Sequence, residues 1–296
     1  MDKITWALIA IVAGAVIGAG LTYVFKKLPE KWLQDYDYDP KAPDFRLSKR
    51  MKFIPHGVIS AALLAIAYSA AIVCDHDGFF LGGANPYRLI AVLLAWPVII
   101  MVAMSDRLNR IIPDEFSIAL LVIGIGSTIG DCLVRSPWHS PYAAWYVPLL
   151  NHVIAGVAGF GVLWVIGFLS ETFLGKEGMG MGDMKLLGAC GMLCGCYGLI
   201  VTLYVGIILG GLFAIPLFIR KRIRIANENK MIRESSDPVA ARRELAKKKA
   251  NIHFADDPDY LAFGPFLAMG AGVFIALEPV WHSQLFGVFA AMGVYF

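Results

Sequence analysis

The sequence predicts an all-α membrane protein, a bundle of about eight transmembrane helices. Its 296 residues are 58% hydrophobic and only 17% charged, with a mean hydropathy of +0.64, which is too apolar for a soluble domain of this length. The apolar residues form runs close to the length of about 20 that an α-helix needs to cross a bilayer. Lys and Arg gather in alternate connections between these runs, as expected of a multi-pass protein.

The predicted spans follow one another along the whole chain. They are 4–25, 53–73, 87–104, 116–134, 147–170, 184–196, 197–219 and 261–278. The first run is longer than the apolar core of a signal peptide, and no small-residue cleavage site separates it from Lys26. The sixth and seventh spans come from one apolar block that must be divided near Gly195 to Gly198. The last apolar piece, 284–296, is too short to span and is expected at the membrane interface.

The basic residues predict the orientation, because positive charges are retained on the cytoplasmic side. Connection 26–52 carries eight Lys and Arg, whereas 74–86 carries none; 105–115 carries two, 135–146 one and 220–260 eleven. We therefore expect both termini outside the cell (inner) membrane, with the connections 26–52, 105–115, 171–183 and 220–260 in the cytoplasm.

This topology divides the chain into five parts. A first helix (1–25) precedes a cytoplasmic loop (26–52), a transmembrane core (53–219), a basic cytoplasmic loop (220–260), and a final helix with the interfacial segment (261–296). Within 220–260, Asp237 and Pro238 are typical of the start of a short basic helix over 239–249. The loop itself is interpreted as a solvated segment facing lipid headgroups.

Two aspartates are the strongest candidates for chemistry. Asp106 ends the third span and Asp183 begins the sixth, so the topology places both at the cytoplasmic boundary. A carboxylate at the edge of hydrocarbon is costly unless something pairs or uses it. Two carboxyl groups that meet in a partly desolvated site share one proton, as in aspartic proteases: one activates a water and the other donates to the carbonyl oxygen.

The neighbouring residues are suited to such a site. Gly180 and Gly182 permit close approach of a neighbouring backbone or a substrate, although helix packing would also explain them. Pro113 favours a helix start, and Asp114 fits the positive end of that helix's dipole. Lys185 could either support the Asp183 carboxylate or extend to lipid headgroups, and the sequence does not decide between the two.

With these motifs, Asp106 to Pro113-Asp114 and Gly180-Met181-Gly182-Asp183-Met184-Lys185, the sequence resembles the type IV prepilin leader peptidases, aspartic intramembrane proteases. The stretch 263–268 is similar to the final-helix signature of that family, and 17–29 to the end of its first helix. The resemblance implies that Asp106 and Asp183 are the catalytic pair. It also implies that the substrate is a prepilin or pseudopilin with a short basic leader.

The sequence departs from the family at one point. Bifunctional members carry two Cys-x-x-Cys pairs after the first helix, and 26–52 has no cysteine. We therefore predict no metal site, and no cofactor for proteolysis. S-adenosylmethionine would be needed only if methyltransferase activity is retained, which this departure leaves open.

Other residues and functions stay as hypotheses. Glu171 and Glu177 could attract a basic leader, and His152 is expected to form a hydrogen bond between helices. The rival functions are another protease with a Gly-x-Gly-Asp core, of the preflagellin or signal-peptide-peptidase type, a proton- or cation-coupled transporter that uses Asp106 and Asp183, and a magnesium-dependent lipid phosphotransferase. The bilayer is the expected surrounding and nothing indicates nucleic acid; the oligomeric state is not predicted.

Overall fold

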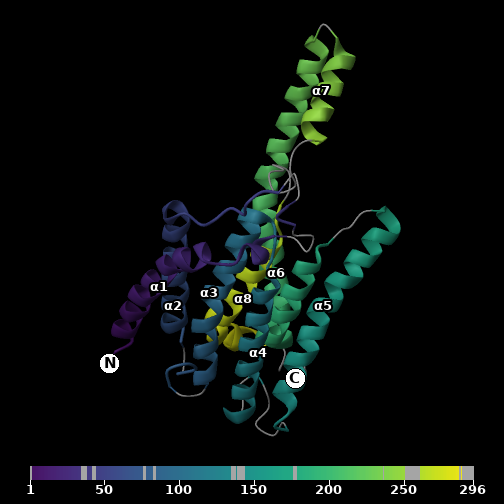
Figure 1. Cartoon of the computed structure of the whole chain (residues 1–296). Coiled ribbons are helices and arrows are strands. Elements are labelled where there is room, and N and C mark those ends of the chain that lie inside the picture. Colours follow the sequence, from purple (N-terminus) through teal and green to yellow (C-terminus); the bar gives the residue numbers. More distant parts are fainter. Residues whose placement is uncertain are drawn as a thin grey trace.

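The computed structural model is a helical bundle with a long arm projecting from one end (Figure 1). It describes residues 2–34, 39–41, 45–75, 78–82, 85–134, 138, 144–175, 179–235, 237–250, 261–286 and 288. The main helices are α1 (Lys3–Lys26), α2 (Val58–Val73), α3 (Pro86–Asn109), α4 (Asp114–Val134), α5 (Val147–Leu174), α6 (Met181–Glu234), α7 (Pro238–Ala250), α8 (Gly264–Ala276) and α9 (Glu278–Trp281). Three short helical turns, η1 (Glu30–Leu33), η2 (Phe53–Gly57) and η4 (His282–Phe286), complete the described part.

Six of the described helices are long and apolar enough to cross a membrane, or seven if the bent pair α8 and α9 is one span. The prediction of an all-α membrane bundle is confirmed. Large apolar side chains such as Ile4, Val157 and Ile207 are exposed on the outside of the bundle, as expected of helices that face lipid.

Helix α6 turns back on itself at Gly195, which has φ 72° and ψ −178°, a conformation open to glycine. A Cβ on Gly159 of α5 would lie 2.7 Å from the Leu187 carbonyl oxygen and 3.2 Å from Leu199 Cδ1. In a continuous helix these two leucines would be about 18 Å apart along the axis. The short segment of α6 (181–194) and the long segment (196–234) are therefore antiparallel, and the predicted division of the apolar block is confirmed.

Small residues let the helices approach closely. Gly14 and Gly18 of α1 face the backbone of α2, where a Cβ on Gly14 would lie 2.7 Å from the Leu64 carbonyl oxygen. In the same way, a Cβ on Gly156 of α5 would lie 3.3 Å from the Gly188 carbonyl oxygen on the short segment of α6. Such contacts are typical of helix packing in membranes, where van der Waals contact replaces the hydrophobic effect.

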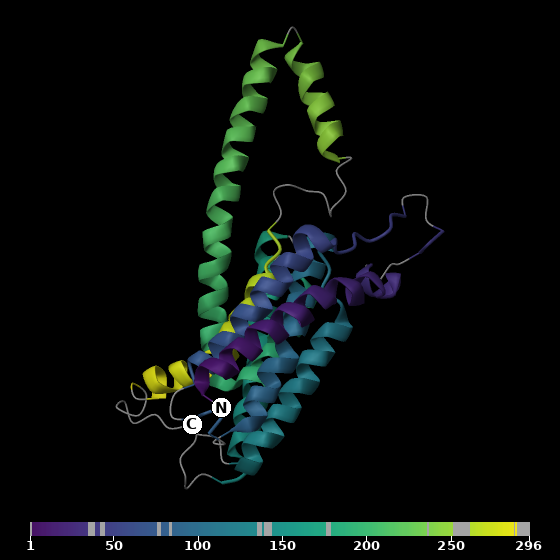
Figure 2. The same cartoon turned by 90° about the vertical axis from the view of Figure 1, so that its left-hand side faces the viewer.

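The arm corrects the expected loop 220–260. Helix α6 continues without interruption to Glu234, and α7 folds back beside its end (Figure 2). The predicted helix after Asp237 is confirmed, because the Asp237 carboxylate accepts hydrogen bonds from the N–H groups of Val239 and Ala240, each at 3.0 Å. Most of the predicted interfacial segment 284–296 and all of 251–260 lie outside the described residues.

Candidate active site

Two carboxyl groups converge on the first residue of α8. Asp106 lies near the end of α3 and is only 4% exposed, and Asp183 lies in the first turn of α6. A Cβ on Gly264 would lie 2.7 Å from Asp106 Oδ2 and 3.0 Å from Asp183 Oδ1. Both oxygens are therefore within 3.0 Å of one point in space, so the structure brings together the two aspartates that the sequence selects.

The surroundings of this pair suit a shared proton. Asp183 Oδ1 is buried and has no hydrogen-bond partner among the described residues, so it is available to a proton or to a water molecule. The positive charge of Arg110 and the negative charge of Asp183 both act on Asp106. Two carboxyl groups that converge in one buried site favour the form in which a single proton is shared, because two neighbouring negative charges repel each other there.

The turn after α3 fixes Asp106. Arg110 adopts the left-handed conformation with φ 59°, and its N–H donates to the Asp106 carbonyl oxygen at 2.8 Å. The Ser105 hydroxyl donates to the Ile111 carbonyl oxygen at 2.9 Å. This turn directs Ile112 back over the site, where its Cδ1 would lie 2.5 Å from a Cβ on Gly264.

Gly180 and Gly182, on either side of Met181, differ in their surroundings: Gly182 packs against Ile112, whereas Gly180 is exposed. A Cβ on Gly182 would lie 3.3 Å from Ile112 Cβ, tighter than most real contacts, so glycine here lets the start of α6 approach the turn after α3. Gly180 is exposed at the N-cap of α6, and a Cβ there would lie 3.7 Å from Asp183 Oδ2, an ordinary contact. The exposed side of Asp183 is therefore the side next to Gly180.

Lys185 binds a residue other than the two partners considered from the sequence. Its Nζ donates to both carboxylate oxygens of Asp114, at 2.8 and 3.0 Å, and neither side chain is fully buried. Asp114 is also the first residue of α4, as predicted, and Pro113 directly precedes it and is buried. The pair joins the start of α4 to the start of α6, two residues from Asp183.

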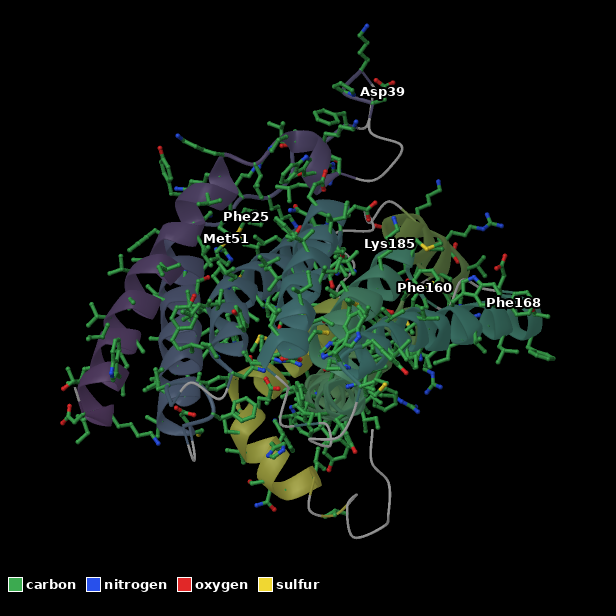
Figure 3. The ribbon with its side chains drawn as sticks, turned by 90° about the horizontal axis from the view of Figure 1, so that it is seen from below. Phe25, Asp39, Met51, Phe160, Phe168 and Lys185 are labelled. Atoms are coloured by element: carbon green, nitrogen blue, oxygen red, sulfur yellow. The ribbon has the colours of Figure 1, made fainter. Side chains whose placement is uncertain are left out.

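Of the two acidic residues proposed to attract a leader, the structure describes Glu171 alone. Helix α5 leans away from the bundle toward its carboxyl end (Figure 1), and Phe168 lies far out on it (Figure 3). Glu171 is exposed about one turn beyond Phe168. Glu177 lies outside the described residues, so the hypothesis remains a prediction for both.

The connection between α1 and η2 is hydrogen-bonded to the end of α3. Lys49 N–H donates to Asn109 Oδ1 at 2.7 Å, and Asn109 Nδ2 donates to the Lys49 carbonyl oxygen at 3.2 Å. Asn109 is three residues beyond Asp106, so this contact lies beside the site. Phe25 and Met51 are fully buried, and Arg50, next to Met51, donates through Nη1 to the Phe25 carbonyl oxygen at 3.3 Å.

Within this connection, Glu30 carries a well-paired carboxylate. Partial burial would raise the pKa of Glu30, but hydrogen bonds from Gln34, Ser48 and Arg50 outweigh it and lower the pKa to about 2. The described segments 27–34 and 45–52 of this connection are therefore bonded to each other next to the end of α3.

Metal ligands are not gathered near the aspartates. Across the described ranges, no group of three or more His, Cys, Asp and Glu side chains is placed to hold a metal ion. Two carboxyl groups in this arrangement can carry out acid–base chemistry on a water molecule.

Sequence reasoning missed the role of Gly264. The sequence indicates 263–268 only as a signature of the final helix. In the structure, Gly264 of this stretch lies directly next to both carboxyl groups, where a larger residue would contact them. A glycine and a proline at the start of an apolar helix are the only local signals, and they do not reveal which side chains lie above them.

The fold and this site define a polytopic helical membrane protein with a buried pair of carboxyl groups at one end of its bundle. Residues 91–215 match the model of the Type IV leader peptidase family. This segment contains both aspartates, and over it the chain is similar to the type IV leader peptidase family. The resemblance predicted from the motifs is confirmed.

Several curated relatives share this part of the chain, and each is called "Prepilin leader peptidase/N-methyltransferase". The one from Aeromonas salmonicida (strain A449) is 33% identical over 131 residues, 44% of this chain and 40% of the relative. Those from Dichelobacter nodosus and Escherichia coli (strain K12) are 27% and 29% identical, over 77% and 45% of this chain and 60% and 51% of the relatives. The chain thus spans less than two thirds of the length of these relatives. No solved structure matches it significantly.

Proposed function

We propose that this protein is an intramembrane aspartic endopeptidase that removes the basic leader peptide from type IV prepilin-like substrates. The observation that carries the proposal is the convergence of Asp106 Oδ2 and Asp183 Oδ1 within 3.0 Å of one point over Gly264. The match of residues 91–215 to the type IV leader peptidase family supports it.

The two aspartates would act as an acid and a base. The ionised carboxyl group takes a proton from water, which attacks the scissile carbonyl carbon, while the protonated group donates to the carbonyl oxygen. Collapse of the tetrahedral intermediate returns a proton to the leaving amine. Neither a metal nor a covalent intermediate is needed, and we expect no cofactor for proteolysis.

The proposed substrates are prepilins and pseudopilins. The names of the relatives, prepilin leader peptidases, favour these substrates over preflagellins or signal peptides. We place the site at the cytoplasmic face of the inner membrane and both termini outside, on the strength of the Lys and Arg distribution. The eleven basic residues of 220–260 then lie on the side of the aspartates, in agreement with the arm drawn in Figure 2.

Methylation of the new N-terminus is a separate question. The relatives carry N-methyltransferase in their names, but 26–52 of this chain has no cysteine. If purified protein transfers a labelled methyl group from S-adenosylmethionine to cleaved pilin, the chain is bifunctional; cleavage without transfer would make it a peptidase alone.

The peptidase function can be tested in cells with a tagged prepilin. Asp106→Asn and Asp183→Asn should each leave the prepilin uncleaved while the protein accumulates in the membrane. Asp237→Asn is the matched control, because this exposed residue caps α7 and asparagine also caps helices well. Full cleavage by either of the first two variants would exclude the two-aspartate mechanism, and no cleavage by the parent would favour another substrate or a transport function.

A further inference from the structure

A second group of buried ionisable residues lies at the opposite end of the bundle from the aspartates. Arg88, Asp131, His152 and Glu278 come from α3, α4, α5 and α9, and each is at most 2% exposed. Arg88 and Asp106 are both on α3, about 27 Å apart along its axis. Buried charges in a membrane are costly and are retained where they are paired or used.

Arg88 is the centre of this group. Its Nε donates to Asp131 Oδ1 at 3.1 Å and its Nη2 to Asp131 Oδ2 at 2.5 Å, while Asn85 Nδ2 donates to Asp131 Oδ1 at 2.6 Å. Glu278 Oε1 lies 3.5 Å from Arg88 Nε and accepts from Trp138 Nε1 at 2.7 Å. The guanidinium is thereby held in one orientation, which leaves Nη1 directed at α6.

Three of the neighbouring side chains bind the backbone of α6 where it reverses. Arg88 Nη1 donates to the Leu193 carbonyl oxygen at 3.0 Å, and His152 Nδ1 lies 2.8 Å from the Met192 carbonyl oxygen. Asn151 Oδ1 accepts from the Cys196 N–H at 3.0 Å. In a continuous helix, the Met192 carbonyl and the Cys196 N–H would be partners of each other.

These contacts also orient the His152 ring. A carbonyl oxygen only accepts, so Nδ1 carries a hydrogen toward Met192. The other ring nitrogen, Nε2, lies 2.9 Å from Arg88 Nη2 and 3.4 Å from Asp131 Oδ2, so the ring contacts both members of the central pair. Backbone groups freed inside a membrane must find partners in the protein, and here α3 and α5 supply them.

We infer that Arg88, His152 and Asn151 are positioning residues that hold the reversal of α6 and thereby place Asp183 beside Asp106. The short segment of α6 is a rigid helix whose one end bears Asp183 and whose other end receives Arg88 and His152. Arg88 lies on α3, the helix that carries Asp106, and binds the short segment of α6, which carries Asp183. It therefore joins these two helices at the ends that are distant from the aspartates. The inference rests on the proposed function for its kinetic readout alone.

The first test removes the charged side chains of this group together. Arg88→Met, Asp131→Leu and Glu278→Gln in one protein leave no lone buried carboxylate or guanidinium, so the protein is expected to accumulate in the membrane. Proximity is measured without activity: cysteines replace both aspartates, a short bifunctional thiol reagent is added, and the bridge between positions 106 and 183 is quantified by mass spectrometry. We expect the yield of this bridge to fall at least fivefold in the triple-variant background.

A milder variant and a control complete the design. Arg88→Lys keeps the charge but lacks the fork that reaches Asp131 and Leu193 together, so an intermediate yield is expected. Tyr68→Phe removes a buried hydrogen bond to the Leu93 carbonyl oxygen, between α2 and α3, and should leave the yield within twofold of the parent. If the triple variant fails to accumulate, the Arg88→Lys result decides.

Kinetics separates positioning from stability alone. With both aspartates present, the Arg88→Lys protein should cleave with kcat at least tenfold lower and KM within twofold of the parent. A bridge yield and a kcat equal to those of the parent would overturn the inference. A parent that cleaves no prepilin would contradict the proposed function, while the cross-linking comparison would still test the positioning.

Discussion

Replacing Gly264 with alanine should abolish the proposed peptidase activity without unfolding the protein. The new Cβ would lie 2.7 Å from Asp106 Oδ2 and 3.0 Å from Asp183 Oδ1, whereas ordinary contacts begin at 3.4 Å. The Asp106 carboxylate must therefore move by about 0.7 Å. Because displacement of a reacting group by ~1 Å can cost roughly 100-fold in rate, we expect a loss of about that size.

The assay is cleavage of a purified prepilin by the variant in lipid nanodiscs. Gly126→Ala on α4 is the control, because its Cβ would meet nothing within 4 Å and its activity should not change. Thermal unfolding should show both variants folded. Gly264→Ala activity within threefold of the parent would refute the geometry derived for the pair.

One alternative cause can be removed in the same experiment. The Cβ would also lie 2.5 Å from Ile112 Cδ1, an atom that valine lacks. The double variant Gly264→Ala, Ile112→Val should remain inactive, since the conflict with the carboxyl groups persists. Recovery of activity would assign the effect to Ile112 and contradict the prediction.

Three further predictions concern supports of the site. Lys185 and Asp114 are both partly exposed, so a double-mutant cycle with Lys185→Met and Asp114→Asn, followed by thermal unfolding, should give a coupling below ~1 kcal/mol; a larger value would show a more buried pair. The Glu30 pKa is lowered from 4.5 to about 2, so its ionised form stabilises the folded protein above pH 4.5 and this stabilisation is lost as the pH falls toward 2. Glu30→Gln should therefore unfold at a lower temperature than the parent at pH 6, with the difference disappearing near pH 2; a constant difference would contradict the assignment. Gly191→Ala would place a Cβ against the Ala155 backbone and should cost about 1–3 kcal/mol of stability, measured by chemical unfolding, whereas an unchanged midpoint would argue against that helix contact.

The spans and the two aspartates could be predicted because each depends on local composition. Apolar length and the alternation of basic connections are read directly from the chain, and Asp106 and Asp183 stand out as charges at the ends of apolar runs. The division at Gly195 was also predictable in place, since one block was too long for a single span.

Contacts between distant segments could not be predicted in this way. Lys185 binds Asp114, 71 residues earlier, and Gly264 lies under both aspartates through the packing of α8. Neither contact has a signal in local sequence. Arg88, Asp131 and Glu278 did have a signal, as ionisable residues in or next to apolar runs, but only the structure shows that they meet.

The helical arm could not be predicted for a different reason. Residues 220–234 are mostly polar, and a polar stretch that follows an apolar span is typical of a loop, whereas here α6 continues through it. The stretch is nevertheless rich in good helix formers and forms the i,i+4 ion pairs Arg224–Glu228 and Lys230–Glu234, which stabilise a helix that lies outside the bundle.

The central claim is that Asp106 and Asp183 act as one catalytic unit. The measurement is the rate of prepilin cleavage by purified protein in nanodiscs, for Asp106→Asn, Asp183→Asn and the variant that carries both changes, each with EDTA present. Because the pair shares one reaction, the two single variants should fall to the same residual rate and the double variant should fall no further. A single variant that retains more than a tenth of the parent rate, or loss of parent activity with EDTA, would contradict the account.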